Sequence, residues 1–358
     1  MNRRSLLLLA PLAALAMHAS CTRTSTTATE ASPRVLVGAG ASLPYPLYSK
    51  WAAVYAKVEP TVRVNYQSVG SGAGIRQMSD GVVDFGATDE PLSKSEREKA
   101  STPLVHVPTT IGAVVLAFNL PGQRELALSG ELVADIFLGN VKRWNDPRLA
   151  AANPGRTLPN EEIVVVHRAD GSGTSAALTE LLSKSSAAWR DTVGSGTSPR
   201  FPVGVGAKGN EGVTALVKST PLAIGYVELA YARQANLPAA HVKNRAGKLV
   251  APTVESLTKA AASADLSAIG GPDEPRAALV DAPDEGAYPI TALSYVVVPR
   301  DGHDVAKTEA LAKFLWWAVH DGQQLSAALD FAPLTPALVE RSEKALRELR
   351  ADGRAALR

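Results

Sequence analysis

Three glycine-rich segments hold the residue types best suited to chemistry in this sequence. They are residues 38–43 (GAGASL), 70–74 (GSGAG) and 168–175 (RADGSGTS), and each lies between a predicted strand and a predicted helix. Glycines let the backbone turn tightly, and the first turn of a helix leaves backbone N–H groups without partners. Those N–H groups, the helix dipole and nearby hydroxyls favour an anion. Taken singly, each segment also suits an ordinary strand-to-helix turn, and none matches the P-loop or dinucleotide-binding pattern.

The third segment carries charged residues as well as turn residues. Arg168 supplies a permanently charged fork suited to an oxyanion, and Asp170 can hold that fork in place. Taken alone, the pair could equally be a surface ion pair of little energetic value. Asp89 follows a short apolar run and precedes Pro91, a position typical of a turn residue or helix cap. Beside an anion site its carboxylate would be repulsive unless the anion brings a proton to donate.

The sequence gives little support for a catalytic site or a metal site. A serine hydrolase would need a Gly-x-Ser-x-Gly pentapeptide, and no such pentapeptide contains Ser71 or Ser172. The histidines lack metal-ligand spacing, and a single cysteine excludes sites built on several cysteines. We therefore expect no enzyme activity, no metal and no cofactor.

Composition and charge narrow the class of protein. With 358 residues, 46% apolar and 20% charged, the chain is globular and long enough for two domains. Without Arg3 and Arg4 it has 35 basic residues against 35 acidic ones, and aromatics make up only 5%. A neutral chain with few aromatics lacks the usual features of a nucleic-acid binder, so we expect no nucleic-acid partner.

The N-terminus has the layout of an export signal. Two arginines precede a 13-residue apolar run, which is too short to span a bilayer, and we interpret residues 1–20 as a signal peptide. Cys21, the only cysteine, resembles the lipid-attachment cysteine of bacterial lipoproteins, although His18 stands where that pattern prefers Leu. An ordinary cleavage site beside an unrelated thiol is the alternative. Residues 21–33 contain no large apolar residue, and we interpret them as a flexible tether.

Beyond residue 34, strands alternate with helices, which predicts an α/β fold with mostly parallel sheets. Apolar spacing over 45–58 predicts a helix whose buried face includes Val54 and Val58, and 111–118 predicts a strand buried in a parallel sheet. Ser93 and Ser129 are predicted helix caps. The remaining expected strands are 62–66, 82–87 and 163–166, and the remaining expected helices include 308–320 and 336–349.

Six segments together carry a family resemblance. They are GAGASLPYP (38–46), VNYQSVGSGAGIRQM (64–78), VDFGATDEPLS (83–93), HRADGSGTS (167–175), GVGAKGNEGV (204–213) and AIGYVELAYA (223–232). In this order they resemble the phosphate-binding proteins of bacterial phosphate-specific ABC transporters, and the likeness covers nearly the whole chain from residue 35. The resemblance implies a two-lobed type II periplasmic-binding-protein fold with the ligand in the cleft. The expected lobes are 34–109 plus 290–358, and 110–289.

The resemblance also implies the ligands and partners. Carried over position by position, the phosphate ligands fall on Ser42, Leu43, Ser71, Asp89, Arg168, Ser172, Gly173 and Thr174, and Asp170 matches the partner of the arginine. The family often has Thr-Phe where this chain has Ser42-Leu43, but a backbone N–H at 43 survives that change. The implied protein is a periplasmic, lipid-anchored monomer that passes phosphate to membrane permease subunits. The alternatives are a binder of another oxyanion, a surface adhesin on the same fold and, with least support, a phosphate-ester hydrolase.

Overall fold

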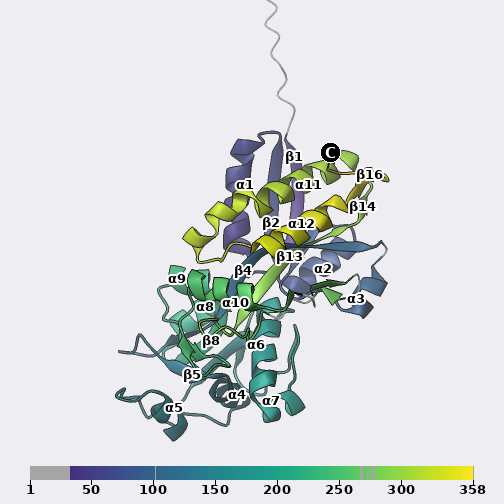
Figure 1. The fold of residues 1–358 in the computed structure, drawn as a ribbon. Helices are drawn as coiled ribbons and strands as arrows, with labels where there is room; N and C mark the ends of the chain where they lie inside the picture. Colours follow the sequence, from purple (N-terminus) through teal and green to yellow (C-terminus); the bar gives the residue numbers. More distant parts are fainter. Residues whose placement is uncertain (1–32, 101, 267–268, 272–273, 276–278, 358) are drawn as a thin grey trace, which may run out of the picture. The chain divides into compact units, whose positions relative to one another are not determined.

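Two long strands, β4 (Leu104–Asn119) and β13 (Thr291–Pro299), lie at the centre of the main sheet (Figure 1). The computed structural model describes residues 33–357 except 101, 267–268, 272–273 and 276–278. Within it, Pro33–Arg358 forms one compact unit. The predicted signal peptide, Cys21 and residues 21–32 of the predicted tether lie outside the described residues.

The main sheet has eight strands in the order β2-β1-β3-β13-β4-β8-β6-β7. The six flanking strands are β1 (Arg34–Gly40), β2 (Val62–Ser68), β3 (Phe85–Thr88), β6 (Val164–Arg168), β7 (Val205–Ala207) and β8 (Ala223–Glu228). β1 pairs in parallel with β2 and β3, and β6 pairs in parallel with β7 and β8. The short strands are β5 (Ala127–Ser129), β9 (His241–Lys243), β10 (Leu249–Val250), β11 (Ile269–Gly271), β12 (Glu274–Pro275), β14 (Asp301–Gly302), β15 (Arg350–Ala351) and β16 (Arg354–Ala355).

Helices connect the parallel strands and pack against the sheet. α1, α11 and α12 contact β2, β1 and β4 respectively, and α8 contacts β8 (Figure 1). The described helices are α1 (Tyr45–Val58), α2 (Ser71–Ser79), α3 (Lys94–Lys99), α4 (Gly130–Leu138), α5 (Pro147–Ala152), α6 (Gly173–Ser185), α7 (Ala187–Thr192), α8 (Gly209–Ser219), α9 (Leu229–Gln234), α10 (Val254–Ser263), α11 (Val305–Val319) and α12 (Pro336–Arg347). In the part of the chain described here, no helix is both long enough and apolar enough to cross a bilayer.

The α/β class is confirmed, but the central strands differ from the prediction. β4 is apolar and buried, yet it pairs antiparallel with both β13 and β8, so the sheet is mixed. Residues 104–113 of β4 pair with β13, and residues 114–119 pair with β8. A continuous apolar run indicates burial on both faces but carries no information about the direction of the neighbouring strands.

The helix caps were predicted correctly, whereas the structural predictions for two apolar residues were wrong. Ser93 forms a capping box with Glu96, and the Ser129 hydroxyl accepts from Leu132 N. Val58, assigned to the buried face of α1, is 57% exposed, and Val82, assigned to a strand, is 67% exposed. Both lie at the ends of their predicted elements, beyond the region that packs against the sheet.

Candidate anion site

The glycine-rich loops that join strands to helices meet one another in the structure. The 70–74 loop contacts the 168–175 loop directly, since Gly72 N donates to Gly171 O at 3.1 Å and Gly173 N donates to Ser71 Oγ at 3.3 Å. Gly70 has a φ of +91°, and a Cβ there would lie 2.2 Å from Asp170 Oδ2. Only glycine tolerates both the conformation and the close approach.

Four buried hydroxyls at this meeting point act as acceptors in every hydrogen bond described for them. Ser42 Oγ accepts from the backbone and side-chain nitrogens of Asn210, at 3.1 and 2.9 Å. Ser71 Oγ accepts from Gly173 N, and Ser172 Oγ accepts from Ser175 N as the cap of α6. Thr174 Oγ1, the fourth, accepts from two side chains. A hydroxyl has one hydrogen and two lone pairs, so each of these groups keeps its hydrogen for a further acceptor.

Arg168 and Asp170 form a buried, bidentate ion pair. Arg168 Nε and Nη2 donate to the two carboxylate oxygens of Asp170 at 2.8 and 2.5 Å, and Nη1 donates to Thr174 Oγ1 at 3.3 Å. The Arg168 side chain is 1% exposed. Three of its five N–H groups are used in these bonds, which leaves two for a ligand. Burial raises the pKa of Asp170, but the hydrogen bonds and the charge of Arg168 outweigh it and lower that pKa overall.

Asp89 places a carboxylate against the N-terminus of α6. Its Oδ1 accepts from Ser294 Oγ at 2.6 Å, while a Cβ on Gly173 would lie 2.8 Å from Oδ2 and 2.4 Å from the Asp89 Cβ. Position 173 therefore requires glycine, and Oδ2 faces the first turn of α6. Burial raises the pKa of Asp89 to about 7, although the Ser294 bond and the Arg168 charge oppose that rise.

Leu43, predicted to act through its backbone, has a completely buried side chain. Its Cδ2 atom lies 2.8 Å from where a Cβ on Gly112 would be, so it packs against β4. Among the described hydrogen bonds, none uses the Leu43 N–H. The side chain thus belongs to the core, and the N–H is available to a ligand.

Two residues of this cluster had no role in the sequence prediction. Asn210 joins Ser42 to Thr174 through its side chain, and its Oδ1 accepts from Glu228 N at 2.9 Å. Ser294 comes from β13, 205 residues beyond Asp89. The Lys208–Gly209–Asn210 sequence at the start of α8 is a signal of the same kind as the other glycine-rich turns. Nothing near Ser294 in the sequence indicates its role.

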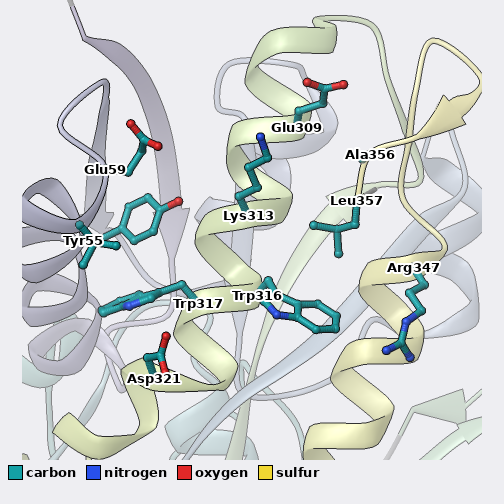
Figure 2. A pocket seen from close by; sticks show the side chains of 11 residues that line it. Tyr55, Glu59, Glu309, Lys313, Trp316, Trp317, Asp321, Arg347, Ala356 and Leu357 are labelled. Carbon is teal, nitrogen blue, oxygen red and sulfur yellow. The ribbon is translucent and has the colours of Figure 1, made fainter.

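A pocket of about 850 Å³ is lined by residues of α1, α11, α12 and the C-terminal segment (Figure 2). Tyr55 from α1 and Trp316 and Trp317 from α11 line it, together with Lys313 and Arg347. It contains none of the predicted ligands. Both tryptophans are only half-buried, and the Arg347 guanidinium lies 5.4 Å from the centroid of the Trp316 ring. A cation already covers that ring, as in an ordinary cation–π contact.

The fold and the cluster of donors together have the features of a protein suited to binding an oxyanion. A family model described as "PBP superfamily domain" matches residues 26–321. The phosphate-binding protein PstS of Pasteurella multocida is 42% identical, over 88% of this chain and 91% of its own, and that of Xylella fastidiosa is 44% identical, over 86% and 83%. A human phosphate-binding apolipoprotein has the same fold, with a TM-score of 0.71 at 19% identity over 90% of this chain and all of its own.

The chain therefore belongs to the PBP superfamily and, within it, to the family of PstS phosphate-binding proteins. This agrees with the family and the type II fold expected from the sequence motifs.

Proposed function

We propose that this protein binds inorganic phosphate outside the inner membrane and delivers it to the permease of a phosphate ABC transporter. Its place among proteins named PstS supports this function. The proposed ligands are Ser42, Leu43, Ser71, Asp89, Arg168, Ser172, Gly173 and Thr174, with Asp170 holding Arg168.

The observation that carries the proposal is the set of unused donors on buried groups. The hydroxyl hydrogens of Ser42, Ser71, Ser172 and Thr174, two N–H groups of Arg168 and, in the first turn of α6, the backbone N–H of Thr174 make no other hydrogen bond among those described, and all are available to one oxyanion. A dehydrated anion needs several donors, because a buried charge without hydrogen bonds is strongly destabilised.

Asp89 makes the site specific for phosphate. Near neutral pH, phosphate keeps at least one P–OH, which donates to Oδ2, whereas sulfate has only acceptors and meets the carboxylate without a hydrogen between them. A site built around one donor can discriminate by orders of magnitude, since the competitor leaves a buried group unpaired. Asn at position 89 offers a donor as well as an acceptor, so Asp89→Asn should narrow the difference in affinity between the two anions.

We infer a binding role without covalent chemistry. His167 adjoins Arg168 in sequence, but its ring stacks on Phe201 at 4.6 Å and its Nδ1 contacts Arg168 O. It therefore points away from the hydroxyls and is not placed to act as their general base. The relatives are named as binding proteins, which agrees with this proposal.

We propose two lobes, 34–109 plus 290–358 and 110–289, that close around the ligand. The change in partner of β4 between Ala113 and Val114 supports a boundary close to the proposed one. Hydrogen bonds from Tyr231 OH to Ser42 O, at 2.7 Å, and from Ser68 Oγ to Glu211 Oε1, also at 2.7 Å, would join the two lobes. Hinge closure around a ligand is the expected motion for such an arrangement.

We propose further that Cys21 is acylated and anchors a monomeric receptor to the membrane. Its position directly after the predicted signal peptide supports this. Wild-type protein should then partition into membranes, and Cys21→Ser should remain uncleaved or soluble. Stable attachment needs more than one acyl chain. A mature N-terminus beyond Cys21, without lipid, would contradict the anchor and leave the phosphate site unaffected.

Isothermal titration with phosphate, sulfate and citrate tests the function. We expect phosphate to bind far more tightly than the other two. Equal binding of sulfate would favour a general oxyanion receptor. Absence of binding to all three would favour another role for the fold, such as adhesion.

A further inference from the structure

Ser294 is a completely buried serine, and among the described hydrogen bonds its hydroxyl contacts the proposed site through Asp89. It lies on β13 opposite Thr110 of β4, and the register of the two strands shifts between Ser294 and Tyr295. The extra residue at this bulge is Thr109 of β4, and bulges often occur beside functional sites. Here the Ser294 hydroxyl donates to Asp89 Oδ1 at 2.6 Å, the length of a charge-assisted bond.

The backbone of Ser294 is held by a chain of buried hydroxyls. Thr109 Oγ1 donates to Ser294 O at 2.9 Å, and it lies 2.5 Å from Tyr48 OH. Because the single hydrogen of Thr109 goes to Ser294, Tyr48 must be the donor in the second contact. A chain of hydrogen bonds from α1 through β4 thus holds this point of β13 in place. The hydroxyl of Ser294 is therefore preorganised for Asp89.

The two oxygens of Asp89 have different surroundings. Oδ1 is occupied by Ser294, and Oδ2 faces Gly173 at the N-terminus of α6. The charged and titratable groups around the carboxyl group are Arg168 from β6 and the phenols of Tyr48 and Tyr66 from α1 and β2. Of these, only Arg168 favours the ionised carboxylate, and Ser294 adds a hydrogen bond to the same form.

We propose that Ser294 is a specificity-determining positioning residue, which occupies Oδ1 of Asp89 and leaves Oδ2 as the acceptor that faces the anion. This rests on the proposed phosphate function and deepens it. With Ser294 present, Asp89 is an acceptor above a pKa of about 7, which suits an anion that carries a proton and repels one that does not. Without Ser294, the carboxyl group binds a proton more readily and becomes a donor, which a fully ionised sulfate can accept.

The test is a pH series of phosphate and sulfate affinities for wild type, Ser294→Ala and a control. Thr110→Val is the matched control, because it removes a buried hydroxyl that has no hydrogen-bond partner from the position paired with Ser294. A bond to a charged group contributes enough to predict a fall of about tenfold in the phosphate-to-sulfate affinity ratio of Ser294→Ala. Sulfate binding should also begin at a higher pH than in wild type. Thr110→Val should retain the wild-type ratio and pH profile.

Two further variants distinguish an effect of Ser294 that acts through Asp89 from a general disruption of the fold. Ser294→Thr keeps the hydroxyl and should restore the wild-type pH profile. In an Asp89→Asn background, Ser294→Ala should no longer change the pH profile, because the titrating group is gone. If wild type binds phosphate and Ser294→Ala shows an unchanged ratio and profile, the role of Ser294 is refuted. If wild type binds no phosphate, the proposed function itself fails.

Discussion

Replacing Asp89 by Asn should make the ligand-free protein more stable, and increasingly so as the pH rises. Asp89 is 7% exposed, and burial raises its pKa from 3.8 to about 7. The unfolded chain therefore loses this proton near pH 4, and the folded chain loses it near pH 7. Between these values the folded state binds more protons, so its free energy of unfolding falls as the pH rises.

The magnitude follows from the two pKa values. A tenfold change in proton affinity corresponds to about 1.4 kcal/mol, so the difference between 3.8 and about 7 corresponds to about 4 kcal/mol. The ionised carboxylate destabilises the fold by this amount above pH 7, in spite of Ser294 and Arg168. The amide oxygen of Asn can still accept from Ser294 Oγ but does not titrate.

Urea unfolding of wild type and Asp89→Asn, in buffers free of phosphate and sulfate, measures this difference at each pH. We expect the stability gained in Asp89→Asn to rise by about 4 kcal/mol from about pH 4 to about pH 8. The contributions of other titrating groups cancel between the two proteins. Asp191→Asn is the control, since that side chain is 71% exposed. Its difference in unfolding free energy from wild type should not change with pH. If the difference in unfolding free energy between Asp89→Asn and wild type also stays constant with pH, the conclusion that burial raises the pKa of Asp89 is refuted.

Substitutions at three other positions test the site by titration with phosphate. Arg168→Ala should weaken phosphate binding by about 2–5 kcal/mol, and Arg168→Lys by less, because Lys keeps the charge but loses the planar fork. An unchanged phosphate affinity in Arg168→Ala would exclude the 168–175 loop from the site. Gly173→Ala should abolish phosphate binding, because the added Cβ would lie 2.4 Å from the Cβ of Asp89. Tight binding of phosphate by this variant would contradict the close contact between positions 89 and 173. Tyr231→Phe, which removes bonds to Ser42 O and Glu211, should weaken binding by about 1 kcal/mol, and an unchanged affinity would argue against a role for Tyr231 in closure.

The sequence predicted local features well because their causes are local. Ser93 and Ser129 cap helices through bonds to residues three positions away, and Ser172 does the same for α6. Arg168 and Asp170 are two residues apart, so their pairing could be expected from their spacing. The apolar run in β4 likewise predicted burial.

The assembled site depends on contacts between distant parts of the chain. Asn210 reaches Ser42 across 168 residues, and Ser294 reaches Asp89 across 205. The antiparallel pairing of β13 with β3 places Tyr295 opposite Thr88, which brings Ser294 beside Asp89, the residue that follows β3.

The amino-acid sequence by itself determined the glycine-rich turns, the helix caps and the arginine–aspartate pair, since each follows from neighbours within a few residues. The tertiary structure decided which oxygen of Asp89 faces the site, how far its pKa rises and which polar groups share the hydroxyls of Ser42 and Thr174. The physical reason is that burial and hydrogen-bond partners depend on the packing of strands and helices far apart in the chain, and no local pattern of residues encodes that packing.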